Sequence, residues 1–317
     1  MSKLQKLQIE EIYTPGFIDR IWYDEERGRE LPVAIWYPSS SIKSSPIHYL
    51  QLPSKVAIDG ELANGSFPLV VVSHGIQGHR FNQYYIAEHL AKKGHIVAAV
   101  EHSHDNYLND DMTWTRLNLI NRPKDITFVI DKLLCSDEIG NAIDSNRIGA
   151  LGHSFGGYTV LAASGAVLDM KLVITYFNGM KTWEAPGDTS NTKHRESSLL
   201  ESLKDDRIKA TTILAPGLVF GFSRETLKNI KIPFCILYAE HDEVLSNDDN
   251  AKFCHKYLGG ESSVHMIESA GHYVFLPKCT SRQKKIVPEI CFDPGPGRET
   301  LHPEIIELVT NFFLNKL

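Results

Sequence analysis

A serine set between glycines is the feature of this sequence with the most specific chemistry. Residues 152–157 read Gly-His-Ser-Phe-Gly-Gly, so Ser154 is the centre of a G-x-S-x-G pattern. In this pattern the serine occupies a sharp turn from a strand into a helix, and the glycines let the two elements approach each other. An apolar run before it (residues 146–151) and an Ala- and Val-rich run after it (158–166) fit that setting. Ser154 is therefore the candidate nucleophile.

A serine hydroxyl reacts at neutral pH only with a base beside it and an acid that orients the base. The expected chain order is serine, then acid, then histidine. Asp242 follows the apolar run 233–239, and His272 follows the predicted strand 263–267 and a glycine. Both positions lie at the carboxyl ends of predicted strands, where sites in α/β sheets form. We therefore predict that Ser154, Asp242 and His272 act together as a catalytic triad.

Two glutamates compete with the predicted acid. Glu240 and Glu243 lie in the same short segment as Asp242. We prefer Asp242, because its side chain is shorter and it is central in the segment.

Acyl transfer by a serine also needs two N–H donors for the negatively charged oxygen of the tetrahedral intermediate. One is expected from the residue after the nucleophile, Phe155, and the other from the loop after an earlier strand. That loop is Ser-His-Gly-Ile-Gln-Gly at residues 73–78, in which Ile76 is the candidate donor and Gln77 the reserve.

Other polar clusters have simpler explanations. Residues 101–105 read Glu-His-Ser-His-Asp and resemble a metal cluster, but no distant partner with metal-ligand spacing is present. The glycines at 75–78 and 156–157 do not form the G-x-G-x-x-G pattern of dinucleotide sites. We expect His74 and His153 to pack beside the turn as structural residues, and we expect no metal and no cofactor.

These residues need a scaffold, and strand-like and helix-like segments alternate along most of the chain. This alternation predicts an α/β fold with a mostly parallel central sheet and helices on both faces. A single domain over 1–317 is expected, with an N-terminal hairpin at 18–37 feeding the sheet edge, a long loop at 39–66 and a cap insertion at 168–206. Strands are expected at 18–23, 31–37, 67–72, 96–100, 146–151, 208–214, 233–239 and 263–267, and helices at 82–93, 123–134, 158–166, 248–257 and 303–317.

The composition of the chain argues against some classes of binding partner. The chain has 317 residues, a net charge of −6, 42% hydrophobic and 23% charged residues, as in ordinary globular proteins. The negative charge gives no basic surface for nucleic acid or for an acidic membrane. The N-terminus lacks the apolar core of a secretory signal, and no run approaches about 20 apolar residues. A cytoplasmic protein without a transmembrane segment is expected.

The 5 cysteines are too few and too scattered for a disulfide framework. Cys279 and Cys291 bracket a loop with proline and glycine, and they would bridge if the compartment were oxidising. The sequence leaves this pairing open.

Five short segments carry a resemblance to a known family: residues 71–75, 94–102, 122–126, 152–157 and 270–272. In them the chain resembles serine members of the α/β-hydrolase superfamily. It is most similar to bacterial predicted dienelactone hydrolases and more distantly to platelet-activating-factor acetylhydrolases. The resemblance implies an α/β-hydrolase fold and ester hydrolysis by Ser154, Asp242 and His272, with the Ile76 and Phe155 amides as oxyanion donors.

Two positions depart from these families. True dienelactone hydrolases use a cysteine where this chain has Ser154. In the acetylhydrolases the acid follows the strand after the elbow helix, and the corresponding residues 214–217 contain no carboxylate, which favours Asp242.

The sequence thus predicts a lipase-like serine esterase that works through an acyl-enzyme on a small-molecule or lipid ester. A peptidase or thioesterase with the same triad is an alternative within enzymes, because the fold does not fix the leaving group. A catalytically silent binding protein on a hydrolase scaffold is the alternative from another class. The loop 39–66 and the segment 168–206 are expected to shape the substrate pocket.

Overall fold

A ten-stranded sheet runs through the computed structural model, which describes residues 13–179 and 200–317. In spatial order the strands are β10 (Ser262–Ile267), β9 (Phe234–Ala239), β8 (Ile208–Leu214), β7 (Ile143–His153), β5 (Phe67–Ser73), β6 (Ile96–Val100), β2 (Arg29–Ser39), β1 (Thr14–Asp24), β4 (Leu52–Ile58) and β3 (Ser45–Tyr49). Neighbouring strands from β10 to β6 pair in parallel, and β2 pairs antiparallel with both β6 and β1. The mostly parallel sheet predicted from the sequence is confirmed.

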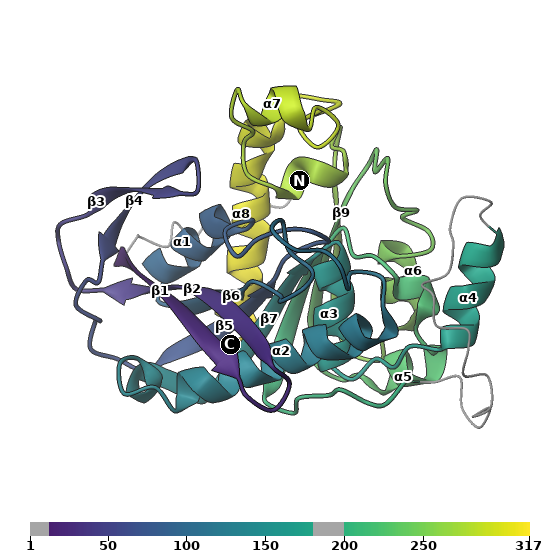
Figure 1. Ribbon diagram of the computed structural model, residues 1–317, viewed down its shortest axis with the longest axis horizontal. Helices are drawn as coiled ribbons and strands as arrows, with labels where there is room; N and C mark the ends of the chain where they lie inside the picture. The colour runs from purple at the N-terminus through teal and green to yellow at the C-terminus, as the bar shows by residue number, and fades with distance from the viewer. Residues whose placement is uncertain (1–12, 180–199) are drawn as a thin grey trace, which may run out of the picture.

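Helices cover both faces of the sheet, as Figure 1 shows. The helices are α1 (Tyr84–Lys92), α2 (Arg116–Leu134), α3 (Phe155–Ala163), α4 (Met170–Gly179), α5 (Arg224–Asn229), α6 (Ala251–Tyr257), α7 (Gln283–Ile286) and α8 (Arg298–Lys316). Side chains alternate between the two faces along a strand. Val70 and Val72 of β5 share a buried cluster with α1 and α8, whereas Leu69 and Val71 share the other with α2 and α3.

The N-terminal hairpin is longer than the expected segment 18–37 and lies inside the sheet. Strands β1 and β2 pair from Thr14 opposite Ser39 to Asp24 opposite Arg29. β2 joins the parallel strands through β6, and β4 pairs with the outer side of β1. The expected position at the sheet edge is therefore wrong, because a second hairpin extends the sheet beyond β1.

That second hairpin, β3 and β4, occupies the region expected to be a loop, 39–66. Pro46 and Pro53 argue against strands when only the sequence is known, because proline has no N–H to bond to a neighbouring strand. However, β3 is the edge strand, and β4 pairs with β1 only at Ala57 and Ile58, so neither proline faces a second partner strand. The hairpin packs over α1 through Tyr49, which is buried and whose hydroxyl donates to Glu88 at 2.8 Å.

Helix α2 begins before the predicted start at residue 123. Thr115 caps it, since its hydroxyl oxygen accepts an N–H of the first turn. Pro123 lies inside the helix and cannot bond the carbonyl of Leu119 four residues before it. The Tyr158 hydroxyl donates to that carbonyl at 2.6 Å. The Leu119 carbonyl, which Pro123 leaves without a partner within the helix, thus joins α2 to α3 by a hydrogen bond.

Helix α4 falls within the predicted cap insertion 168–206, whose residues 180–199 lie outside the described part of the chain. The cap and the single-domain organisation stay predictions. Within the described ranges, no helix is both long and apolar enough for a membrane span.

Candidate active site

Ser154 lies at the turn from β7 into α3, with φ of 53° and ψ of −118°. A residue with a side chain rarely adopts a positive φ, and the strain is of order 1–3 kcal/mol. Backbone hydrogen bonds impose this conformation. The N–H of Ser154 donates to Leu214 at 2.9 Å, and its carbonyl accepts from Gly157 and Gly217, each at 2.8 Å. The hydroxyl is thereby held at the pocket described below.

The glycines around Ser154 are required by close backbone contacts. A Cβ added at Gly152 would lie 2.1 Å from the carbonyl oxygen of Gly156, and one at Gly156 would lie 2.1 Å from that of Ser73. No side chain fits at either position, which explains why the sequence pattern has glycine on both sides of the serine.

The structure brings the three predicted side chains together. The Ser154 hydroxyl lies 3.0 Å from Nε2 of His272, although 118 positions separate them, and Nδ1 of His272 lies 2.8 Å from Oδ2 of Asp242. The His272 and Asp242 side chains are only 2% and 1% exposed. With a proton on Nδ1, the imidazole donates to Asp242 and accepts from Ser154, as a general base requires.

The three acids after β9 have separate contacts. Asp242 alone contacts the imidazole of His272. Glu243 accepts the backbone N–H of His272 at 3.0 Å, and Glu240 accepts that of Ser269 at 2.8 Å. The preference for Asp242 thus agrees with the geometry, and Glu243 is an additional anchor that the sequence did not reveal.

Two backbone N–H groups next to Ser154 have no hydrogen-bond partner among the described residues: those of Ile76 and Phe155. The loop that contains Ile76 runs against the nucleophile, since a Cβ added at Gly75 would lie 3.2 Å from the Ser154 Cβ. The N–H of Gln77, the reserve candidate, donates to Asp105 at 3.3 Å. This favours Ile76 over Gln77.

His74 and His153 lie beside this turn without reaching the Ser154 hydroxyl. The His153 ring packs 5.3 Å from the His272 ring, and burial lowers the pKa of His153 well below its ordinary value. Nδ1 of His74 contacts the carbonyl of Gly75 at 2.6 Å, and burial lowers its pKa as well. Both rings are neutral at pH 7.

The polar segment 101–105 is occupied by internal contacts. Nε2 of His102 lies 2.8 Å from Ser73 Oγ, and its Nδ1 lies 2.9 Å from Asp125. These side chains form a second hydrogen-bonded chain of serine, histidine and aspartate. All three are fully buried, so no substrate reaches this serine. In residues 13–179 and 200–317 no group of histidine, cysteine or acid side chains is arranged to hold a metal.

Ser154 and His272 line a pocket of about 600 Å³. Leu50 and Leu52 of the β3–β4 hairpin contribute to it, which agrees with the expected role of residues 39–66. The described residues of 168–206 do not line it. A pocket of this size and lining suits a substrate with an apolar group.

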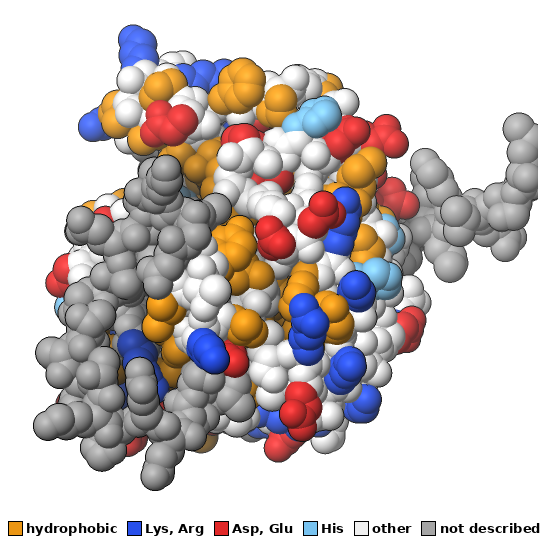
Figure 2. Space-filling view, turned by 90° about the vertical axis from the view of Figure 1, so that its right-hand side faces the viewer, with side chains coloured by type: hydrophobic (Ala, Val, Ile, Leu, Met, Phe, Trp, Pro, Cys, Tyr) orange, Lys and Arg blue, Asp and Glu red, His pale blue; other side chains and the backbone are white. Residues whose placement is uncertain are grey.

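Another part of the wall is a segment that sequence reasoning missed, residues 276–298, named here the α7 segment. It projects at the top of the molecule in Figure 1, and Figure 2 shows lysine, arginine and hydrophobic side chains there. Ile286, Val287 and Ile290 supply apolar lining, and Arg282 supplies a cationic side chain.

A disulfide and a buried arginine hold the α7 segment. Cys279 and Cys291, the pair that the sequence left open, are bonded. Arg298 donates to the carbonyls of Pro277 and Ile290 at 3.0 and 2.8 Å and pairs with Asp293 at 3.0 Å. This wall is therefore a fixed part of the pocket.

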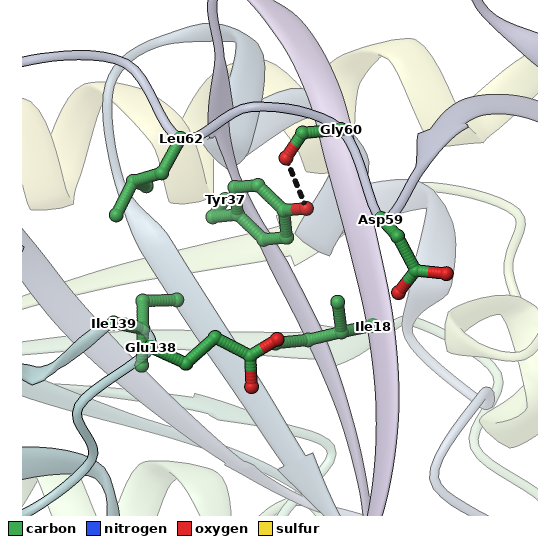
Figure 3. Close-up of a pocket in the computed structure, with 7 residues that line it drawn as sticks. All are labelled: Ile18, Tyr37, Asp59, Gly60, Leu62, Glu138 and Ile139. Carbon is green, nitrogen blue, oxygen red and sulfur yellow. Dashed lines mark hydrogen bonds between the residues drawn. The ribbon is translucent and has the colours of Figure 1, made fainter.

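A smaller cavity of about 160 Å³ lies elsewhere, between β1, β2 and the residues 59–62 and 138–139. In Figure 3 the Tyr37 hydroxyl donates to the carbonyl of Gly60, at 2.7 Å. The described residues that line it include no serine, cysteine or histidine, so the larger pocket is the candidate active site.

Comparison with known proteins agrees with the architecture. A family model described as platelet-activating factor acetylhydrolase, isoform II, matches residues 47–110, a stretch that includes β5 and the Ile76 loop. No curated protein sequence matches the chain.

Solved structures resemble it over most of its length. A ferulic acid esterase from Streptomyces cinnamoneus has a TM-score of 0.67 at 20% identity, covering 98% of this chain and 91% of that one. A dienelactone hydrolase from Anabaena variabilis has a TM-score of 0.54 at 13% identity, covering 96% and 100%. These likenesses confirm the expected α/β-hydrolase fold.

Proposed function

We propose that this protein is a serine hydrolase that cleaves carboxylic esters through an acyl-enzyme intermediate. One observation carries the proposal: Ser154 and His272, hydrogen-bonded to each other and through His272 to Asp242, line a largely apolar pocket. The names of the similar proteins, an acetylhydrolase, a ferulic acid esterase and a dienelactone hydrolase, support ester chemistry.

In the proposed reaction Ser154 Oγ attacks the ester carbonyl carbon while its proton passes to Nε2 of His272. Asp242 stabilises the imidazolium that forms. The carbonyl oxygen becomes negatively charged and accepts hydrogen bonds from the N–H groups of Ile76 and Phe155. Each of these hydrogen bonds stabilises the transition state by about 3 kcal/mol.

The intermediate then expels the alcohol, which takes the proton from His272, and leaves the acyl group on Ser154. Water enters, gives a proton to His272 and attacks the acyl carbon. Collapse of the second intermediate releases the acid and returns the proton to Ser154.

The pocket supports a substrate with an apolar group, a small-molecule or lipid ester. The expected cytoplasmic location stays a prediction, and the bond between Cys279 and Cys291 is a reason to test it, because disulfides persist mainly in oxidising compartments.

The test is a burst of p-nitrophenol from p-nitrophenyl esters together with labelling by a fluorophosphonate. Both should be lost in Ser154→Ala. Ser145→Ala, at an exposed position on the same strand, should keep both. Undiminished turnover by Ser154→Ala would refute the proposal. Failure of the wild-type protein to react with the fluorophosphonate would favour the silent binding protein, and a panel of amides and thioesters separates the enzyme alternatives.

A further inference from the structure

Arg122 is a fully buried arginine of α2 that lies behind the candidate active site. Its Nη1 lies 2.5 Å from Oδ2 of Asp105, which is also fully buried. A buried ion pair is often no more stabilising than apolar side chains of the same volume. Stability alone therefore does not account for this pair, and its contacts indicate another role.

One set of contacts made by Arg122 and Asp105 fixes the loop that contains Ile76. Nη2 of Arg122 donates to the carbonyl of His74, and Oδ1 of Asp105 accepts the N–H of Gln77 at 3.3 Å. Ile76 lies between these two residues in the chain. The ion pair thus holds the loop on both sides of the N–H proposed as an oxyanion donor.

A second set of contacts made by Arg122 fixes the segment that carries the other proposed donor, the N–H of Phe155. The guanidinium carbon of Arg122 lies 4.9 Å from the centre of the Phe155 ring. Nε of Arg122 donates to Thr159 Oγ1 at 3.0 Å, and that hydroxyl bonds the carbonyl of Phe155 at 3.1 Å. One side chain therefore contacts both segments that carry the donors.

The pair stays charged at neutral pH. Burial raises the pKa of Asp105, but the charge and hydrogen bonds of Arg122 and the amide of Asn118 outweigh it, so that the pKa lies below its ordinary value. Burial lowers the pKa of Arg122, and Asp105 opposes this effect. Charged hydrogen bonds are stronger and more directional than neutral ones, which suits a positioning role.

We infer that Arg122, held by Asp105, is the positioning residue of the oxyanion hole, which keeps the N–H groups of Ile76 and Phe155 at a fixed separation. The inference rests on the proposed function, since the two donors act only if an oxyanion forms. It adds a requirement to that function: the guanidinium fork, and not the positive charge alone, sets the rates of acylation and deacylation, since an oxyanion forms in both steps.

The test compares Arg122→Lys with the wild-type enzyme. Lysine keeps the charge but cannot bond His74, Asp105 and Thr159 together. We expect kcat for a p-nitrophenyl ester to fall about 10²-fold with KM within about threefold, as when one oxyanion donor is lost. Inhibition by an aryl trifluoromethyl ketone should weaken by a similar factor, because its adduct with Ser154 carries an oxyanion.

The matched control is Arg29→Lys. Arg29 is 2% exposed and bonds Asp125 at 2.8 and 3.0 Å in the same buried network, without contact to either donor. We expect this variant to lower Tm but to keep kcat and inhibitor affinity. A merely structural role of Arg122 predicts the same result for both lysine variants.

Asp105→Asn provides a second route if Arg122→Lys does not fold. It keeps the shape and an acceptor for Gln77 but weakens the bond to Arg122, and we expect the same loss of kcat and of ketone affinity. Wild-type-like kcat in a folded variant of either residue would overturn the inference. The proposed function would survive that result as long as Ser154 still reacts with the fluorophosphonate.

Discussion

Asp242 accepts the ring N–H of His272 at 2.8 Å, and its other carboxylate oxygen accepts the backbone N–H groups of Val244 and Leu245 at 3.0 and 2.7 Å. The turn after β9 thus holds one oxygen of the carboxylate, and the other oxygen orients the imidazole. A substitution that keeps the bonds to the turn but removes the negative charge therefore tests the charge of Asp242 separately from its position.

Asp242→Asn should retain the fold and lose most of the activity. The amide oxygen of asparagine can accept hydrogen bonds from the two backbone N–H groups, but its NH₂ group is a donor and cannot accept a hydrogen bond from Nδ1–H of His272. The imidazole therefore takes the wrong tautomer. We expect kcat to fall about 10⁴-fold with an unchanged Tm. The measurement is steady-state hydrolysis of a p-nitrophenyl ester beside thermal unfolding.

The matched control is Glu240→Gln, because Glu240 belongs to the same segment and contacts Ser269 instead of His272. Its kcat should stay within about twofold of wild type. Equal losses in the two variants would contradict the assignment of Asp242 as the acid.

The sequence predicted the parts of this site that depend on short patterns. Ser154 is marked by local glycines, and Asp242 and His272 each follow an apolar strand. Parallel strands end at one edge of the sheet, so three such positions meet there without knowledge of any long-range contact. This is why strand ends predicted the site better than any other feature of the chain.

Features that depend on contacts far apart in the sequence were missed. The α7 segment has no regular pattern, and its place at the pocket follows from Arg298 and from a disulfide. Strands β3 and β4 were hidden by Pro46 and Pro53, since a strand tolerates proline where one side has no partner strand, and the unpaired sides are known only from the sheet order. Arg122 bonds Thr159 across 37 positions, which no local pattern predicts.

Gly156→Ala should destabilise the protein strongly. Its Cβ would lie 2.1 Å from the carbonyl oxygen of Ser73, so β5 and α3 would have to separate. We expect a loss of about 3 kcal/mol in the free energy of unfolding or failure to fold, measured by urea denaturation. Gly217→Ala is the control, because its Cβ would meet its nearest neighbour at 3.5 Å, an ordinary contact. A small effect at both positions would show that the turn is looser than the structure describes.

Cys291→Ser should loosen the α7 segment. Opening a loop with a sequence separation of 12 lowers the free energy of unfolding by about 3 kcal/mol. Arg298 still holds the segment, so we expect KM to rise severalfold and kcat to change little. Dithiothreitol should reproduce this effect in the wild-type protein. Cys135→Ser, which removes an exposed free thiol, should change neither quantity. An unchanged KM after reduction would contradict this prediction and would show that the shape of the pocket does not depend on the disulfide.

Buried histidines should make the fold sensitive to mild acid. Burial lowers the pKa of His95 to about 4, below the ordinary value of 6.5. Between these pH values the unfolded chain binds a proton at His95 that the folded protein does not bind. The part of the folding free energy that depends on neutral His95 is therefore present in full above pH 6.5 and is lost as the pH falls toward 4. His95 alone then accounts for about 2 kcal/mol of lost stability at pH 5.

His95→Asn removes this proton uptake. The free energy of unfolding from urea titrations at pH 7 and pH 5 should therefore fall by about 2 kcal/mol less in the variant than in the wild type. His241→Asn, at an exposed histidine, should behave as the wild type does. If His95→Asn shows the wild-type loss, the folded protein protonates His95 as readily as the unfolded chain, and acid sensitivity must come from other buried histidines such as His74 and His153.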